Sequence, residues 1–229
     1  LPSCEELGYA YDASWCVGQK TLKCPFDQNA IYCTNPYKEI ECQIGSVLYE
    51  DKKCYTSAPR GKSPIGVVFD TSKRLALSLK SPDTLENRHQ GTNWGGDGID
   101  IPDLENYTLE AINSSDTDGQ TNTDKIIVAL GMGNGTNVAA GWCKNIGGFL
   151  PSISELKTLY SNKAKVKEGL SSLPDADHLI GEGVYESIYF WSSNEKDDEW
   201  AWAMNLYSAK SVAQSAKKTL SYTRCAVAY

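Results

Sequence analysis

The sequence predicts an α+β protein in which a small disulfide-rich module, residues 1–55, precedes a larger domain, residues 56–229. Six of the eight cysteines lie within residues 4–54, where the apolar segments are too short to build a core without cross-links. After residue 56, a capped amphipathic helix and several segments of alternating apolar and polar residues predict helices beside antiparallel strands.

The composition is that of a folded, acidic protein. The 229 residues are 41% hydrophobic and 22% charged, with a net charge of −7 and no basic patch. This charge argues against a nucleic acid or an anionic membrane surface as the partner. No apolar run approaches the ~20 residues of a transmembrane helix, so we expect no membrane span. The opening LPSCEELGYAYD lacks a signal-peptide pattern, so either a signal has been removed or the chain has been trimmed.

The cysteines predict structural disulfides in an oxidising compartment, and therefore a secreted or cell-surface protein. The chain has no Cys-x-x-Cys pair and only two histidines, His89 and His178, which argues against a zinc site or a thioredoxin-like centre. Cys42 and Cys54 flank a strand-and-turn segment, and we expect them to pair. The other cysteines of the module are expected to pair among themselves, with the connectivity open: Cys4, Cys16, Cys24 and Cys33.

Residues 64–80 predict a β-hairpin, because GVVF and LALSL are β-rich and the intervening DTSK is turn-like. Residues 81–122 are polar, and we expect a long irregular stretch around Trp94. In TDKIIVALGMGNG the glycine spacing matches neither a dinucleotide-binding fingerprint nor a P-loop. We expect a helix from about Asp124 through Leu130 instead. A glycine-loosened segment and a second helical turn follow, and that turn carries Ala139, Ala140 and Cys143.

The clearest helix start is a capping box, in which Ser152 and Glu155 satisfy main-chain N–H groups that the helix leaves free. The predicted helix, residues 152 to about 161, has one apolar face: Ile153, Leu156, Leu159 and Tyr160. With its two short helices, the domain is expected to close on antiparallel strands. These strands are predicted at residues 189–194, 199–208 and 220–229.

The WAWAMNLY segment predicts a strand whose two faces differ. One face carries Trp200, Trp202, Met204 and Leu206, and the other carries Ala201, Ala203, Asn205 and Tyr207. We expect at least two of Trp191, Trp200 and Trp202 to belong to the core. Since Asn205 and Tyr207 face away from Trp202, we expect them to be the better contact residues.

The order of these parts resembles the C-type lectin fold, and above all the bacterial surface proteins with DUF1566 or Lcl C-terminal-like domains. GWCKNIGGFLPSISEL at 141–156 carries the resemblance, followed by YFWSSNE at 189–195, AWAMNLYS at 201–208 and the pair Arg224 and Cys225. The resemblance implies a C-type-lectin-like domain over about residues 60–229. It also implies that Cys143 is a structural residue that pairs with Cys225, rather than a nucleophile.

The resemblance leaves several functions open, because relatives of this fold include lectins, adhesins, the formylglycine-generating enzyme and retroelement-diversified variable proteins. The usual calcium-bridged sugar site is not expected, because WSSNE at 191–195 departs from Trp-Asn-Asp and the Glu-Pro-Asn loop is absent. Calcium elsewhere stays open, with Asp116 and Asp118 as weak candidates and Asp97 and Asp100 as similarly weak ones. No other cofactor is expected.

Catalytic interpretations find little support in the sequence. The oxidase branch of the fold relies on a close pair of late cysteines, whereas Cys225 is the sole late cysteine here. No Gly-x-Ser-x-Gly motif is present, and the acidic run at residues 197–199 is typical of a solvated turn. We therefore expect a protein that is not an enzyme.

We expect a binding surface between residues 191 and 222, where aromatic residues have polar neighbours. The candidate contact residues are Asn194, Glu195, Asp197, Asp198, Trp200, Asn205, Tyr207, Ser208 and Lys210. The sequence thus predicts a secreted or surface-exposed bacterial binding protein, adhesin-like, with a protein or glycan ligand on a cell surface. A self-assembling, pilin-like fibre subunit is the alternative, and an enzyme ranks third.

Overall fold

A computed structural model describes residues 10–12, 32–34, 37–82, 92–131, 138–177, 179, 189–207 and 211–229. The strands are β1 (Ala10–Asp12), β2 (Tyr32–Thr34), β3 (Glu39–Ile40), β4 (Val47–Tyr49), β5 (Cys54–Tyr55), β6 (Pro64–Asp70), β7 (Leu75–Ser78), β8 (Tyr189–Glu195), β9 (Trp200–Asn205), β10 (Val212–Ala216) and β11 (Ala226–Ala228). The helices are α1 (Leu109–Ser114), α2 (Gly119–Leu130), α3 (Ala139–Asn145), α4 (Ile153–Ser161) and α5 (Lys163–Ser171). The chain is therefore a mixed α and β protein with antiparallel sheets, as predicted.

The largest sheet has six strands in the order β11-β7-β6-β4-β5-β3. The predicted boundary at residue 55 falls between β5 and β6 of this one sheet, and β4 pairs with both of those strands. Residues 39–55 are therefore continuous, through hydrogen bonds, with the part of the chain that follows. A separate two-stranded ladder joins β1 to β2.

The hairpin expected at residues 64–80 is confirmed as β6 and β7. The turn between them is shaped by Asp70, whose Oδ1 accepts the main-chain N–H of Ser72 at 2.9 Å and of Lys73 at 3.0 Å. Strand β6 has a continuous apolar run because both of its faces are covered: Val67 and Phe69 join one buried cluster and Val68 joins another.

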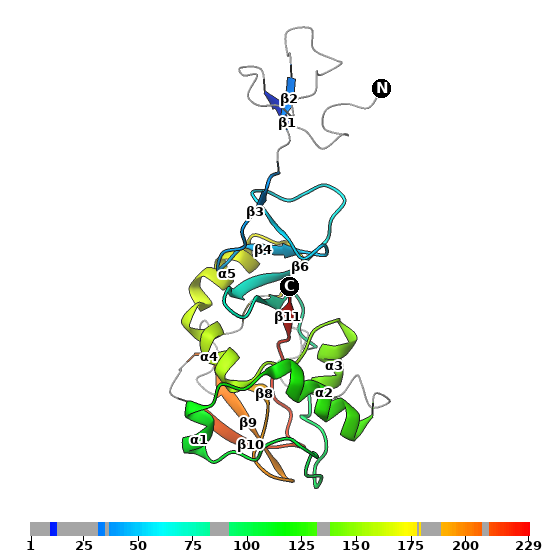
Figure 1. Cartoon of the computed structure of the whole chain (residues 1–229), viewed down its shortest axis with the longest axis vertical. Helices are drawn as coiled ribbons and strands as arrows, with labels where there is room; N and C mark the ends of the chain where they lie inside the picture. Colours follow the sequence, from blue (N-terminus) through cyan, green and yellow to red (C-terminus); the bar gives the residue numbers. More distant parts are fainter. Residues whose placement is uncertain are drawn as a thin grey trace.

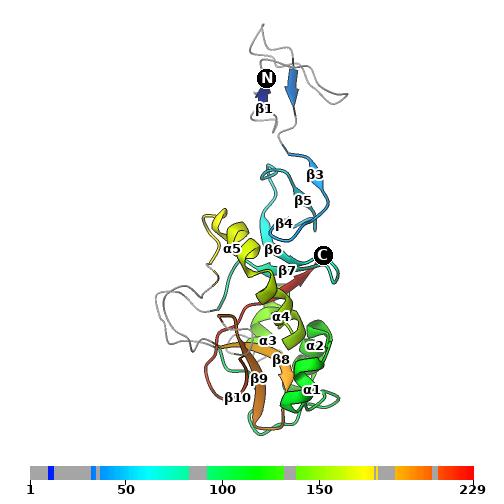
Figure 2. The same cartoon turned by 90° about the vertical axis from the view of Figure 1, so that its left-hand side faces the viewer.

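A second sheet has three strands in the order β10-β9-β8. Figures 1 and 2 show this sheet and the six-stranded sheet arranged along the long axis of the chain, with α4 between them. Helix α4 contacts β6 of one sheet and β8 and β9 of the other. Helix α2 also contacts β8, and it contacts α3 as well.

Strand β9 has the two faces that its alternation predicted, and it separates two buried clusters. Trp202 and Met204 pack into the cluster that includes α4 and β6, whereas Ala201 and Ala203 pack with Trp94 and Trp191. The small alanine side chains leave room on their face for these two indole rings. Both faces of the strand are therefore buried, and Trp191 and Trp202 are core residues as expected.

The predicted capping box is confirmed at the start of α4. The hydroxyl of Ser152 accepts the N–H of Glu155 at 3.3 Å, and the Glu155 carboxylate accepts the N–H of Ser152 at 2.8 Å. The second helical turn is confirmed as α3. Helix α2 is longer than predicted, because the side chain of Asp118 caps it and starts it at Gly119 rather than near Asp124.

The prediction of two short helices was wrong, since the described residues form five. Helix α1 lies inside the stretch predicted to be irregular, and α5 directly follows α4. Helix α5 contacts the sheet so closely that a Cβ atom on Gly169 would lie 2.5 Å from the carbonyl oxygen of Gly45. Strand β10 also falls outside the predicted strands, and the last predicted strand is shorter, as β11.

Two disulfides connect the described residues, and both were predicted. Cys42 pairs with Cys54, and Cys143 pairs with Cys225. Cys143 is therefore a structural residue. The expected pairing of the other cysteines lies outside the described side chains: Cys4, Cys16, Cys24 and Cys33.

Candidate functional site

Two exposed segments meet at the end of the three-stranded sheet. They are residues 95–106, which lead from Trp94 towards α1, and residues 196–199, which connect β8 to β9. The N–H of Gly98 donates to the carbonyl oxygen of Asp198 at 2.9 Å and joins the two segments directly. Together they form the loop surface, the candidate functional site of this chain.

A fully buried ion pair supports the loop surface from below. Glu195 ends β8 and Lys217 follows β10, and the two side chains contact each other with 0% exposure. The ammonium group of Lys217 also donates to the carbonyl oxygen of Ile99 at 2.7 Å. The Glu195 carboxylate accepts the N–H of Ile101 at 3.1 Å. The pair therefore holds the first of the two segments at both of these points.

The indole ring of Trp94 completes this support. The ammonium nitrogen of Lys217 lies 4.9 Å from the centre of the ring, and the indole N–H donates to the carbonyl oxygen of Ser192 at 2.7 Å. Burial raises the pKa of the Glu195 carboxyl, while its hydrogen bond to Lys217 opposes that shift. A buried charge requires such a partner, so these side chains fix one geometry for the surface above them.

The outer side of the loop surface is acidic. Its exposed carboxylates are Asp97, Asp100, Asp103, Glu105, Asp198 and Glu199. Three surface cations lie near them among the described residues. The exposed Lys218 has its ammonium 3.7 Å from the carboxylate of Asp97, and the half-exposed Lys196 and Lys125 bind the Asp197 carboxylate and the carbonyl oxygen of Asp103. Ile99 adds an exposed apolar side chain among the carboxylates. This combination favours a partner with positive charge.

Three of the predicted contact residues lie in the interior of the protein. Asn194, Glu195 and Asn205 are buried, with 0%, 0% and 1% exposure, so they do not lie on the surface as expected. Asn194 is committed to the fold: its side-chain oxygen accepts the N–H of Ile153 at 2.8 Å and its amide donates to Thr117 at 2.9 Å. These three polar residues face the interior because both sides of β8 and β9 are covered.

Asp197, Asp198 and Trp200 do belong to the loop surface or its border. The Asp197 carboxylate shapes the turn by accepting the N–H of Trp200 at 2.8 Å, and Trp200 is half-buried. Asp198 is exposed. Ser208 and Lys210 lie outside the described residues.

Tyr207 is exposed, as expected, but it lies at the opposite end of β9 from the loop surface. A strand of this length spans roughly 20 Å, so the two ends cannot form one small site. Tyr207 is near Lys163, whose ammonium lies 6.0 Å from its ring centre and 4.2 Å from that of Tyr160. The predicted residues therefore belong to two separate surfaces.

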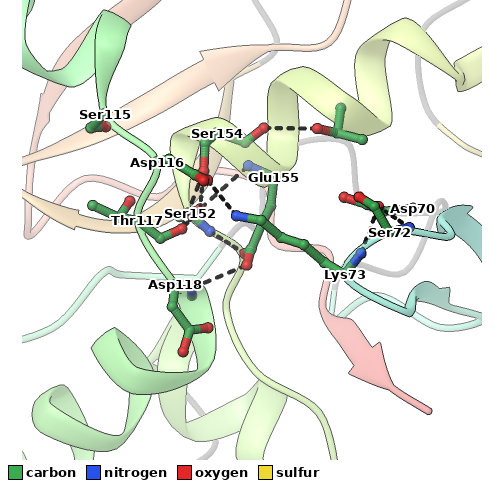
Figure 3. A network of polar contacts seen from close by, with 12 residues as sticks. Asp70, Ser72, Lys73, Ser115, Asp116, Thr117, Asp118, Ser152, Ser154 and Glu155 are labelled. Carbon is green, nitrogen blue, oxygen red and sulfur yellow. Dashed lines mark hydrogen bonds and ion pairs between the residues drawn. The ribbon is translucent and has the colours of Figure 1, made fainter.

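The weak calcium candidates lie in a polar network that Figure 3 shows, where the β6–β7 turn meets the start of α4. Asp116 forms an ion pair with Lys73, and Asp118 caps α2 by accepting the N–H of Gln120 at 3.0 Å. Both carboxylates thus have partners within the protein. No group of three His, Cys, Asp or Glu side chains with metal-binding geometry is present in the described part of the chain.

Glu155 lies at the centre of the same network (Figure 3). Its carboxylate accepts the N–H of Gly119 at 3.2 Å in addition to that of Ser152, so it joins the start of α2 to the start of α4. Burial raises the pKa of this carboxyl, and the two main-chain hydrogen bonds oppose the shift. The network is a structural joint between helices.

Sequence reasoning missed the support that Lys217 and Trp94 give to the loop surface. It also did not assign residues 95–106 to a binding surface, although it named Asp97 and Asp100 as weak calcium candidates. Lys217 stands beside a second lysine in a polar stretch, SAKK, and this pattern is typical of exposed residues. Trp94 lies in a long polar stretch, and loops of that length are often functional or braced by packing. The length of this stretch was therefore the one signal in the sequence that pointed to Trp94 and its neighbours.

Comparison of the chain with protein-family models gives no match, and comparison with curated proteins gives none. Among the described helices, none combines the length and the apolar character that crossing a bilayer requires.

Proposed function

We propose that this chain is a non-catalytic binding protein that uses the loop surface to recognise a positively charged protein ligand. The buried pair of Glu195 and Lys217 is the observation that carries the proposal. It holds residues 95–106, the first of the two segments, at Ile99 and Ile101, at the cost of desolvating two charges. Binding residues are commonly found on loops that a rigid scaffold positions in this way.

The wider setting of the proposal is a secreted or surface-exposed bacterial protein with a C-type-lectin-like fold. The antiparallel sheets, the capped helix α4 and the Cys143–Cys225 disulfide support it, because they follow the order of parts on which the resemblance rests. The two disulfides also support an oxidising compartment. The ligand is proposed to be a protein rather than a glycan, because the exposed charge of the loop surface is negative.

Binding to a surface-protein and glycan array, with calcium and with chelator, tests this function. We expect calcium-independent binding to a basic protein that weakens as salt increases. The double variant Asp198→Asn with Glu199→Gln should weaken it roughly three- to tenfold at low salt. The matched control, Glu168→Gln with Asp175→Asn, removes two exposed carboxylates elsewhere and should bind normally. Equal binding by both double variants, or a calcium-dependent sugar ligand, would contradict the proposal.

A fibre subunit is the second candidate, and the outer edge of β10 favours it. The N–H of Asn205 donates to the carbonyl oxygen of Ser211 at 3.0 Å, and the N–H of Lys217 donates to the carbonyl oxygen of Glu199 at 2.9 Å. These bonds show that every second residue of β10, in step with Ser211 and Lys217, directs its main-chain groups towards β9. The alternate residues Val212 and Gln214 therefore direct their main-chain groups away from β9. Within the described residues these groups have no main-chain partner.

Strand β10 itself also lacks three of the features that usually prevent strands from pairing between molecules. Strand β10 has no charge and no proline, and its pairing with β9 has no register shift. A second copy of the chain can add its own β10 in antiparallel orientation, since identical strands present the same donors and acceptors to each other. This contact joins two copies, and a fibre would need a second, different contact between such pairs.

Sedimentation velocity tests self-association through this edge. If the fibre candidate is right, the wild type forms dimers or larger species and Gln214→Pro stays monomeric. The proline removes an N–H that points away from β9, so the fold keeps its own ladder. Gln214→Ala, which keeps the N–H, should associate like the wild type. A monomeric wild type at high concentration would count against the fibre candidate.

A further inference from the structure

A groove of about 530 Å³ lies apart from the loop surface, on the six-stranded sheet. Its lining comes from β3, from the β4–β5 connection, from the β6–β7 turn and from Tyr229. The apolar part consists of Ile40, the Cys42–Cys54 disulfide and the Tyr229 ring, which pack against a small buried cluster. The volume is within the range of small-molecule sites.

Most of the charged side chains in the groove already have partners. Lys53 forms an ion pair with Glu39 at 2.6 Å, and Asp51 forms one with Lys62. The ammonium group of Lys52 donates to the carbonyl oxygen of Ala228 at 2.8 Å. These groups shape the walls and do not need a ligand as a counter-charge.

Arg74 and Glu41 differ from them, because neither has an opposite charge within 4 Å among the described residues. The Arg74 guanidinium lies 5.2 Å from the centre of the Tyr229 ring, and its own carbonyl oxygen accepts the N–H of Tyr229 at 3.1 Å. This contact restricts the side chain while its N–H groups stay available. The groove therefore offers one positioned cation and one carboxylate.

A second feature of the wall is an acceptor that lacks a donor. Oδ2 of Asp51 accepts from Tyr55 at 2.5 Å, whereas its buried Oδ1 has no donor among the described residues. Buried polar atoms are nearly always hydrogen-bonded, so this wall favours a ligand or water that donates. Thr71 adds a hydroxyl to the lining.

These groups specify the chemistry of a ligand. One guanidinium matches one carboxylate in a two-point hydrogen bond. A phosphate dianion would instead meet the carboxylates of Glu39, Glu41 and Asp51. Hydroxyl groups can donate to Glu41, and the flat face of a sugar ring can cover Ile40 and the disulfide. We propose that the groove binds a sugar acid, with its carboxylate on Arg74 and its hydroxyls towards Glu41 and Thr71.

Calorimetric titration of the full chain with glucuronate tests this site. We expect glucuronate to bind, and glucose, which has the same ring without the carboxylate, to bind at least tenfold more weakly. Arg74→Asn should also weaken glucuronate binding at least tenfold. Asparagine suits the left-handed conformation at this position, where φ is 56°, so the turn is kept. Lys165→Gln, which removes an exposed cation on α5, should leave binding unchanged.

Glycine and inorganic phosphate complete the titration. Tighter binding of either one than of glucuronate would overturn the sugar-acid assignment, as would equal binding of glucose or an unaffected Arg74→Asn variant. The inference does not rest on the loop surface. Asp198→Asn with Glu199→Gln should therefore leave glucuronate binding intact, even where it weakens binding to a protein ligand.

Discussion

Replacing Glu195 with glutamine is expected to lower the free energy of unfolding by about 3–5 kcal/mol. The Lys217 ammonium group would stay buried without its counter-charge, and both side chains have 0% exposure in the folded chain. The loss follows from leaving one charge uncompensated in the interior, rather than from the net value of the pair. Urea unfolding at neutral pH, followed by tryptophan fluorescence, measures it.

A double-mutant cycle separates these two contributions. Combining Glu195→Gln with Lys217→Met removes both charges, and we expect this variant to be more stable than Glu195→Gln alone. As a matched control, Lys196→Met breaks the half-exposed pair with Asp197 and should change stability by only about 0–1 kcal/mol. If Glu195→Gln were as mild as this control, water would reach the pair in solution and the loop surface would lack its proposed support.

The same variant should loosen residues 95–106 locally. The N–H of Ile101 donates to the Glu195 carboxylate, and Lys217 holds the carbonyl oxygen of Ile99. Faster hydrogen exchange at Ile101, with unchanged exchange in β6, would place the effect at the loop surface. A uniform increase across the chain would indicate a global loss of stability instead.

The parts of the fold that could be predicted have strong local signals. The β6–β7 hairpin combines β-rich runs with a turn that Asp70 organises, and α4 has a reciprocal cap at Ser152 and Glu155. The alternation in β9 assigned its residues to the correct two faces. Each of these features is determined by interactions among residues that are close in the sequence, so the sequence alone predicts it.

Helix α5 and strand β10 lacked such signals. In α5 the apolar residues are few, Val166 and Leu170, and Gly169 is a poor helix former. The helix is stabilised by its contact with β6, and Gly169 is required for the close approach to Gly45. Strand β10 is short and largely polar, and its pairing with β9 defines it. Contacts between distant segments override local preference in both cases.

The candidate site shows a related limit. Alternation along β9 places Asn205 opposite Trp202, yet it does not show whether that opposite face meets solvent. Both faces are buried here, so Asn205 became a core residue. Lys217 shows the same limit for a buried residue. A lysine among polar neighbours is usually exposed, and its burial here depends on Glu195, which the sheet places beside it.

The disulfide between Cys143 and Cys225 is expected to contribute about 4–5 kcal/mol to stability, more than the one between Cys42 and Cys54. Its sequence separation is 82 residues, against 12 for the other. The longer loop contains α4, α5 and the three-stranded sheet, so the unfolded chain gains more freedom when this link is removed. The shorter loop should contribute about 3 kcal/mol by the same reasoning.

Paired alanine variants compare the two links under identical conditions. Cys143→Ala with Cys225→Ala and Cys42→Ala with Cys54→Ala each remove one disulfide and leave no free thiol from it. Cys143, Cys225 and Cys54 are fully buried, and Cys42 is half-buried, so lost packing adds slightly more to the first variant. Urea unfolding should show the larger loss for the first variant. A larger loss for the second would mean that the short loop anchors β3 to the sheet more strongly than chain entropy predicts, and that the residual structure of the unfolded chain already restricts the long loop.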